Sequence, residues 1–386
     1  MKKKRIYGLG LIILIIFLGV FYFNYFNNGS KGSYLKRNYK TTNFTEKEMK
    51  SAYKLINDGK DYNVFFTGEH HGYDGNEKIN LELLKYLNEN YGVNYFLCEL
   101  QYSFGKTLNE YIHSGDETLL NEVSSILKSR NPQNFREDFV NFWKELYEYN
   151  KNLPENKKIE AVGIDMDFEG KYTVKQMGKL LPDKNPPEEI KEYILKFRRI
   201  FQVEMSDEEG VEIFQKLYQS VNESTKIYEE YLGETFGDFK NNLASMMNTL
   251  KYSETEDPNR DGLIYDNFMK IYNENPQGKY YGQFGLYHIF KEDFEKGAKP
   301  FYTLANMIEE KGNLRVLSAP IVYSNNFLIN EDVKSLCKNK FTVVKLNGRN
   351  SPYKKELIND FESDAFKLIK GSTTDNYQYM ILLSYE

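Results

Sequence analysis

The sequence predicts an α/β fold: a mixed, mostly parallel central sheet flanked by helices, with a helical insertion subdomain, preceded by one N-terminal transmembrane helix. Three observations predict it. Short runs rich in β-branched and aromatic residues alternate with segments whose apolar residues recur at helical spacing. Residues 170–275 carry helical spacing without a convincing strand signal. An uncharged run, residues 6–23, follows a basic start.

The N-terminal segment has the features of a membrane anchor. About 18 uncharged residues in a helix would span ~27 Å, close to the thickness of a hydrocarbon core. A cleaved signal peptide is the alternative, but bulky residues follow the run where small residues would mark a cleavage site. We therefore expect a cytoplasmic tail at 1–5, a single-pass signal-anchor at 6–26, a polar tether at 27–44, and an extracytoplasmic domain at 45–386 held at the cell membrane.

Composition narrows the range of partners. The formal net charge of −5 argues against a nucleic-acid binder, which would show a basic surface. The two cysteines exclude a disulfide framework, and Cys98, in an apolar run, is better explained as a small buried residue than as a nucleophile. The expected partners are the membrane, through the N-terminal helix, and a small-molecule or peptide substrate. The sequence carries no signal for an oligomeric state.

The first part of the domain alternates helices and strands. We expect a helix over 45–57, a strand over 62–67, a helix over 77–90 and a strand over 93–98. Gly92 ends the second of these helices. The strand–helix–strand order predicts a parallel pair with a right-handed crossover, and in such sheets functional side chains lie past the carboxyl ends of the strands.

The rest of the domain continues this pattern around a long helical block. A helix over 135–150 and a strand over 158–162 precede the insertion at 170–275, and strand signals return at 279–284, 314–317, 341–346 and 377–383. The chain therefore resembles two similar halves, each opening with a strand that runs into a Gly-x-x-His motif.

Polar side chains follow the ends of these strands. The two Gly-x-x-His motifs are Gly68–His71, which includes Glu69, and Gly285–His288. A glycine at a strand end lets the backbone turn sharply, so two such turns on neighbouring strands would bring His71 and His288 together. Glu99 and Asp165 follow two further strands and would add carboxylates.

This set of side chains has two chemical interpretations. Imidazole and carboxylate groups suit zinc, manganese or iron, so His71, His288, Glu69 and Glu99 are candidate ligands of a divalent metal. Without metal, one histidine would act as general base while a carboxylate orients it. In both cases the expected chemistry is attack by activated water on a carbonyl group.

Several of these residues also have a plainer interpretation. His70 is better explained as a residue flanking the site, and His113 as a surface residue. Asp165 could cap a helix. Arg260 could form an ordinary surface ion pair with Asp261. The paired motifs are more specific, because position, residue type and repetition agree.

The motifs together resemble a known superfamily. Gly68–Gly72, Leu97–Glu99, Gly163–Asp165, Asn259–Asp261 and Gly285–His288 are similar, in this order, to the erythromycin esterase-like, ChaN-like and Tiki/TraB superfamily. The helix at 139–150 also ends in Tyr-Asn, as in esterase-like members. One departure is that two residues separate Gly68 from His71, where the esterases carry three.

The resemblance implies an α/β core with a helical subdomain and a cleft lined by Glu69, His71, Glu99 and His288, with Arg260 nearby. Esterase-like members hydrolyse a macrolide lactone ring, Tiki-like members are membrane-tethered, metal-dependent proteases, and ChaN-like members bind haem. A membrane anchor fits poorly with a cytoplasmic antibiotic-inactivating enzyme, so drug resistance is not the expected role.

The first hypothesis is a membrane-anchored extracytoplasmic hydrolase that acts on an ester or amide, with or without a divalent metal. Its candidate catalytic residues are Glu69, His71, Glu99, Asp165, Arg260 and His288. The alternative is a haem- or iron-binding protein of the ChaN-like type, in which Tyr73, Tyr102 or Tyr287 ligates iron. A third, weaker hypothesis is a scaffold that has lost catalysis, against which the retained histidines and glutamates argue.

Overall fold

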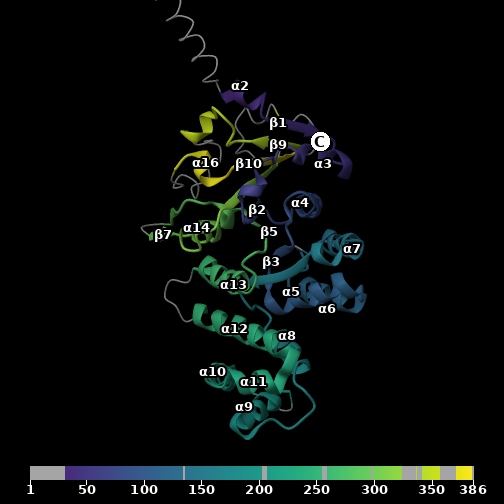
Figure 1. The fold of residues 1–386 in the computed structure, drawn as a ribbon, viewed down its shortest axis with the longest axis vertical. Coiled ribbons are helices and arrows are strands. Elements are labelled where there is room, and N and C mark those ends of the chain that lie inside the picture. Colours follow the sequence, from purple (N-terminus) through teal and green to yellow (C-terminus); the bar gives the residue numbers. More distant parts are fainter. Residues whose placement is uncertain are drawn as a thin grey trace, which may run out of the picture. The chain divides into compact units, whose positions relative to one another are not determined.

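The computed structural model describes residues 31–133, 135–201, 207–253, 259–296, 299–323, 336, 341–356 and 371–384. The chain folds as two compact units: unit 1 comprises Met1–His71 and Phe284–Glu386, and unit 2 comprises Gly72–Gln283 (Figure 1). Among the described residues, no helix is long and apolar enough to cross a membrane. The predicted anchor at 6–26 lies outside them.

Unit 1 contains a mixed sheet. Its strands are β1 (Tyr39–Thr42), β2 (Val64–Glu69), β8 (Val316–Tyr323), β9 (Phe341–Lys345) and β10 (Tyr379–Leu383), in the order β1-β9-β10-β8-β2. The pairs β2–β8 and β8–β10 are parallel, whereas β9 runs antiparallel to β10 and β1. Every residue of β2, β8 and β10 is buried, which explains their almost continuous apolar sequences.

Strand β1 falls in the segment expected to be a polar tether. Its four residues pair with β9, and the Thr41 hydroxyl bonds the Thr342 hydroxyl across the pair at 2.9 Å. Apolar patterning did not predict this strand, because an edge strand needs few apolar residues.

The other elements of unit 1 are short. They are α2 (Lys31–Leu35), α3 (Glu46–Tyr53), η1 (Gly59–Asp61), η4 (Leu286–Ile289), the antiparallel pair β6 (Phe294–Lys296) and β7 (Lys299–Phe301), α14 (Leu304–Glu310), η5 (Pro352–Lys354) and α16 (Thr373–Asn376).

Unit 2 contains parallel strands and most of the helices. Strand β3 (Tyr95–Gln101) pairs in parallel with β4 (Glu160–Asp165) on one side and with β5 (Tyr280–Gly285) on the other. The last two residues of β5 belong to unit 1. The sequence predicted that the first two strands of the domain pair with each other. That prediction is wrong, because β2 pairs with β8, and β3 pairs with β4 and β5. A crossover fixes the direction of two strands but not that they are adjacent.

The helices of unit 2 are α4 (Asn76–Tyr91), α5 (Tyr102–Ser114), α6 (Glu117–Arg130), α7 (Glu137–Lys151), α8 (Gly170–Lys179), α9 (Glu188–Arg199), α10 (Asp207–Glu223), α11 (Thr225–Leu232), α12 (Phe236–Ser253) and α13 (Arg260–Glu274); η2 (Glu155–Lys157) and η3 (Gly233–Thr235) are single turns. The described part of the predicted insertion, 170–275, contains helices and no strand. Helices α8 to α12 lie together in Figure 1. They share an apolar core, in which the Phe197 ring meets the rings of Phe214 and Phe239 edge-on.

The Tyr-Asn at the end of α7 holds elements of unit 2 together. The buried Asn150 amide donates to the Ile159 carbonyl at 3.2 Å and accepts from the Ile159 N–H at 2.7 Å, just before β4 begins. It also donates to the Ile112 carbonyl of α5 at 3.4 Å. The Tyr149 hydroxyl donates to the Asn88 side chain of α4 at 3.0 Å. The motif therefore has a structural explanation in satisfied buried hydrogen bonds.

Two glycines let α5 pack directly on β4. A Cβ on Gly105 would lie 2.0 Å from the Gly163 nitrogen, and a Cβ on Gly163 would lie 2.1 Å from the Gln101 carbonyl oxygen. Neither position has room for a side chain, because the neighbouring atoms belong to the backbone. The Gly163-Ile164-Asp165 motif thus begins with a packing requirement, and β4 ends with a carboxylate.

Candidate functional site

The first candidate set lies at the end of β2 in unit 1. The strand ends at Glu69, whose carboxylate is mostly buried, and His71 follows two residues later with its side chain 71% exposed. Glu69 Oε1 lies 2.5 Å from His71 Nδ1. A carboxylate that accepts the Nδ1 proton leaves Nε2 as the basic nitrogen of the imidazole and fixes the orientation of the ring.

The two Gly-x-x-His motifs make room for each other within unit 1. A Cβ on Gly285 would lie 3.2 Å from His71 Nε2 and 3.5 Å from His288 Cδ2, so both imidazole rings contact the same glycine. A Cβ on Gly68 would lie 2.6 Å from the Ile289 side chain, which follows His288. The structure thus places both imidazole rings close to Gly285, and joint action of His71 and His288 stays a prediction.

The His288 segment is held firmly. His288 lies in η4 and is buried, with its ring edge-on to Phe284 at 6.1 Å between centroids. The Ser318 hydroxyl of β8 donates to the Ile289 carbonyl at 2.6 Å, and the Thr303 hydroxyl donates to the Phe290 carbonyl. These bonds satisfy the backbone just after His288 and limit its movement.

His70 lies beside this set, as the sequence predicted. Its backbone N–H donates to the Tyr323 hydroxyl at 3.4 Å, and its ring lies edge-on to the Tyr323 ring at the end of β8. Burial lowers the pKa of His70; the Glu69 charge acts in the opposite direction, and the neighbouring His71 lowers the pKa further.

The second candidate set lies in unit 2. Arg260, the first residue of α13, donates through Nε to Asp165 Oδ1 at 2.9 Å and through a terminal nitrogen to Glu99 Oε1 at 2.9 Å. The Asp165 side chain is 3% exposed. Burial opposes the charge of Arg260, but the hydrogen bonds and charges of Asp165 and Glu99 outweigh it and raise the pKa of the guanidinium. The set is thus a fixed cation between two carboxylates.

This geometry decides between interpretations that the sequence left open. Arg260 bonds Asp165 and Glu99, so it does not form a surface pair with Asp261, which is buried. Asp165 accepts from Arg260 and from its neighbour's backbone N–H, and is therefore more than a helix cap. Glu99 lies within β3, two residues before the strand ends, and not past its end as predicted.

The metal site stays a prediction. Within the described residues, no group of three or more His, Cys, Asp or Glu side chains is arranged to hold a metal ion. The two candidate carboxylates face other partners, since Glu69 bonds His71 and Glu99 bonds Arg260. Because both carboxylates bond these partners, they do not form a metal-ligand set within the described residues.

Sequence reasoning missed a buried polar network behind Asp165. Gln101, at the end of β3, donates to the hydroxyls of Ser103 and Thr173 at 2.7 and 2.9 Å. Thr173 donates to Asp167 Oδ2 at 2.5 Å. Burial raises the pKa of Asp167 to about 6, although the Thr173 hydrogen bond acts in the opposite direction. The available signal was a glutamine at a strand end, which is too common to indicate a network.

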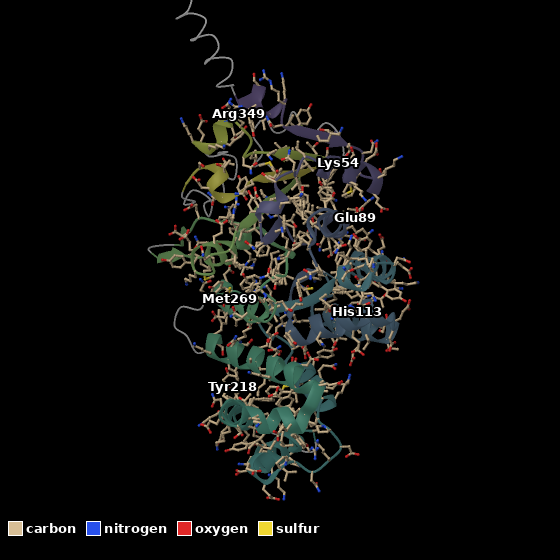
Figure 2. The ribbon with its side chains drawn as sticks, in the orientation of Figure 1. Lys54, Glu89, His113, Tyr218, Met269 and Arg349 are labelled. Carbon is tan, nitrogen blue, oxygen red and sulfur yellow. The ribbon has the colours of Figure 1, made fainter. Side chains whose placement is uncertain are left out.

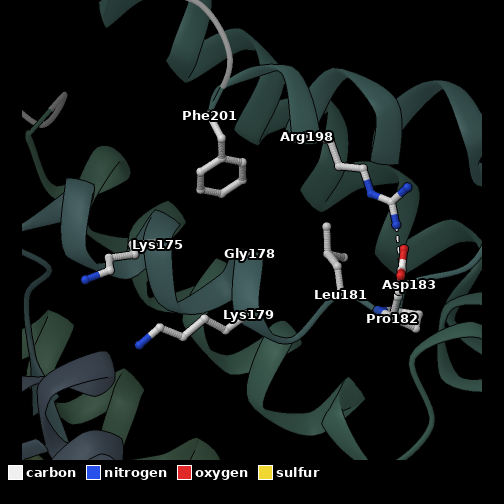
Figure 3. A pocket seen from close by; sticks show the side chains of 8 residues that line it. All are labelled: Lys175, Gly178, Lys179, Leu181, Pro182, Asp183, Arg198 and Phe201. Carbon is white, nitrogen blue, oxygen red and sulfur yellow. Dashed lines mark hydrogen bonds between the residues drawn. The ribbon is translucent and has the colours of Figure 1, made fainter.

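An open hollow of about 490 Å³ lies on the helical insertion, with side chains from α8 and from the end of α9 around it (Figure 3). The Phe201 ring covers Gly178, where a Cβ would lie 2.6 Å from the ring. Its cations have protein partners: Lys175 pairs with Glu122 at 2.6 Å, and Arg198 donates to the Pro182 carbonyl at 2.9 Å. We assign no chemistry to this hollow.

His113 lies at the surface, as predicted (Figure 2). Its Nε2 lies 3.1 Å from Glu160 Oε1, and its Nδ1 lies 2.9 Å from the Asn109 carbonyl. This second His–Glu pair, remote in sequence from the first, serves as a matched control for experiments on His71 and Glu69.

Comparison with solved structures identifies the fold. A protein from Bacillus cereus has 15% identity and a TM-score of 0.65, covering 93% of this chain and 98% of its own. A succinoglycan biosynthesis protein has 13% identity and a TM-score of 0.69, covering 92% and 96%. A mutant erythromycin esterase, EreC, in its open conformation has 12% identity and a TM-score of 0.56, covering 89% and 97%.

These likenesses define the class of the chain by its fold. It is an α/β protein that shares its fold with the erythromycin esterase EreC, in line with the fold that the motifs predicted. At identities this low the likeness shows the fold alone. No protein-family model matches the sequence, and no curated protein is significantly similar to it.

Proposed function

We propose that this chain is a hydrolase that cleaves an ester or amide, with His71 as general base and Glu69 as the group that orients it. The observation that carries the proposal is the 2.5 Å contact between Glu69 Oε1 and His71 Nδ1, with Nε2 facing Gly285. The EreC erythromycin esterase, which shares the fold, adds a precedent for ester hydrolysis.

The proposed chemistry follows from the orientation of the imidazole. His71 Nε2 removes a proton from a water molecule, and the water oxygen attacks the carbonyl carbon of the substrate. The bond from that carbon to the leaving oxygen or nitrogen then breaks, and protonated His71 returns the proton to the leaving group. Glu69 stabilises the transient imidazolium. His288 contacts the same glycine and is the candidate hydrogen-bond donor to the developing oxyanion.

Arg260, Glu99 and Asp165 form a second proposed functional set, which lies within unit 2. The resemblance implies that Arg260 and Glu99 belong to the cleft, and a cation fixed by two carboxylates is preorganised to stabilise negative charge. Arg260→Lys keeps the charge and loses the forked contact. A role in the reaction predicts that Arg260→Lys lowers kcat at temperatures well below its unfolding midpoint. An unchanged kcat would leave Arg260 a structural residue.

We also propose that the enzyme is anchored at the cell membrane and acts outside it. The support is the basic start and the uncharged run of the sequence, which orient a single span with its start in the cytoplasm. Protease added to intact cells should degrade the domain beyond residue 45. A domain that survives this treatment would be cytoplasmic, against the proposal. Release of the chain into the soluble fraction would contradict anchoring.

The test of the activity uses the purified full chain in detergent against a panel of esters and amides. We expect His71→Ala to lower kcat/KM by about 10²–10⁴ and His113→Ala, in the surface His–Glu pair, to have little effect. Absence of any turnover by the wild-type chain, or equal activity of both variants, would contradict the proposal.

Two additions to the same experiment separate the other hypotheses. Loss of turnover with a chelator, restored by zinc, manganese or iron, would assign the metal-dependent form of the reaction. A haem titration tests the alternative function. Of its three candidate tyrosines, the Tyr102 hydroxyl already donates to Asp238 at 3.1 Å, whereas the Tyr287 side chain is exposed. A Soret band lost in Tyr287→Phe would favour haem binding over hydrolysis.

A further inference from the structure

A small cavity lies within unit 2, lined by residues of α12, α13, β4 and the start of α5. Its polar lining comes from Tyr102, Asn241, Ser245, Asn267 and Lys270. The cavity volume is about 20 Å³, which is enough for a water molecule or a small ion. A single small occupant is therefore favoured over larger ligands.

Two polar atoms of this lining have no hydrogen-bond partner among the described residues. They are Lys270 Nζ and Ser245 Oγ, and both atoms are inaccessible to solvent. Ser245 is 3% exposed. Buried polar atoms are nearly always hydrogen-bonded, so a pair without partners facing one cavity indicates a bound species.

The remaining polar groups of the lining are already engaged. The Asn267 side chain donates to the Ile164 carbonyl at 3.1 Å and accepts from Asn248 at 2.8 Å. The Tyr102 hydroxyl donates to Asp238 and accepts from Asn241 at 3.4 Å. What is left over is an ammonium group and a hydroxyl group, which together offer hydrogen-bond donors. The missing species must therefore be an acceptor.

Among the described residues, no carboxylate bonds the Lys270 ammonium. Burial lowers the pKa of Lys270, and the Asp266 charge acts in the opposite direction from a solvent-exposed position one turn earlier in α13. Asp238, the other nearby carboxylate, pairs with Lys106 at 3.0 Å. A buried ammonium without a close carboxylate gains stability from an anion brought in from solution.

We propose that this cavity binds one small monovalent anion of the halide class, such as chloride, held by the Lys270 ammonium and the Ser245 hydroxyl. The small volume favours a halide over sulfate, phosphate or a carboxylate, and the donors match a spherical anion. The competing occupant is a single water molecule beside an uncharged Lys270. The inference is independent of the proposed hydrolase function.

Chlorine NMR line broadening by the full chain tests the proposal directly. We expect the wild-type chain to broaden the chloride signal, bromide to displace the bound ion, and sulfate at equal ionic strength to leave it in place. Lys270→Met should abolish the broadening, and Ser245→Ala should weaken binding roughly tenfold. Lys251→Met, which removes an exposed lysine of α12, should bind as the wild type does.

A second measurement keeps the test decisive if Lys270→Met does not fold. The unfolding midpoint of the wild type should rise and saturate as chloride replaces gluconate at constant ionic strength, because a ligand of the native state stabilises it. The rise should shrink in Ser245→Ala and disappear in Lys270→Gln. Absence of broadening by the wild type, equal broadening by Lys270→Met and Lys251→Met, or a chloride effect unchanged in Lys270→Gln would overturn the proposal in favour of bound water.

Discussion

Replacing Gly285 by alanine tests how strongly turnover depends on the position of the His71 ring. The backbone at Gly285 has φ −52° and ψ 141°, a region that alanine adopts without strain. The added methyl group would lie 3.2 Å from His71 Nε2 and 3.5 Å from both His71 Cε1 and His288 Cδ2. Since ordinary carbon contacts begin near 3.4 Å, the exposed His71 ring must move by a few tenths of an ångström.

The size of the expected effect follows from that displacement. A misplacement of about 1 Å can cost roughly 10² in rate, so a few tenths, with a methyl group beside the basic nitrogen, should lower kcat about tenfold. Stability should change little, because a compatible Gly→Ala substitution gains about 0.4–1 kcal/mol from the unfolded chain and the tight contact offsets part of it.

The assay compares Gly285→Ala with Gly68→Ala, the reciprocal substitution. A Cβ on Gly68 would lie 2.6 Å from the Ile289 side chain and 2.9 Å from that of Leu286, and because both are buried they must repack at a cost of about 1–3 kcal/mol. We expect turnover to fall in both variants, but the urea midpoint to fall in Gly68→Ala alone. Full turnover in Gly285→Ala, or equal loss of stability in both, would refute this reasoning.

Three further predictions concern unit 2. Arg260→Leu leaves the buried Asp165 without its cation and should lower the free energy of unfolding by about 2–3 kcal/mol. This is less than the usual cost of breaking a buried ion pair, because the Arg260 side chain is a third exposed. Urea unfolding measures the change, and a value under about 0.5 kcal/mol would contradict a stabilising role of the pair. Gly105→Ala places a methyl group 2.0 Å from the Gly163 nitrogen, so the backbone must move. The free energy of unfolding should fall by about 3 kcal/mol or more. A urea midpoint equal to that of the wild type would contradict the close packing of α5 on β4. Burial raises the pKa of Asp167 from 3.8 to about 6 in the native state. Between pH 3.8 and about 6 the native state therefore binds more protons than the unfolded state. The free energy of unfolding should fall by up to about 3 kcal/mol as the pH rises through this range. Asp167→Asn should therefore be more stable than the wild type at pH 7 and similar near pH 4, and a stability difference that is constant with pH would contradict the shifted pKa.

The sequence placed the first two predicted strands correctly but set their ends two or three residues too early. The predicted strand over 62–67 is β2, Val64–Glu69, and the predicted strand over 93–98 is β3, Tyr95–Gln101. Apolar patterning reports burial, whereas a strand continues as long as its backbone pairs with a neighbour. For this reason Glu99 lies within its strand.

The candidate site was predictable where it depended on local sequence. The His71 and His288 rings both lie close to Gly285, a glycine that the motif itself pointed out. The partners of Arg260 were not predictable, because Glu99 and Asp165 are far from it in sequence and an adjacent Asp261 offered a simpler pairing. The sequence did not predict the Lys270 cavity. A lysine in an amphipathic helix usually indicates an exposed face, and only tertiary packing shows that this one lines a cavity.

The most direct test of the central claim is the kcat/KM of Glu69→Gln beside that of Glu160→Gln. Both substitutions remove a carboxylate that bonds a histidine, at 2.5 Å from His71 and at 3.1 Å from His113. If Glu69 orients the catalytic base, Glu69→Gln should lose roughly 10²–10⁴ in kcat/KM, and Glu160→Gln should remain close to the wild type. Turnover by Glu69→Gln that matches that of Glu160→Gln would contradict the account.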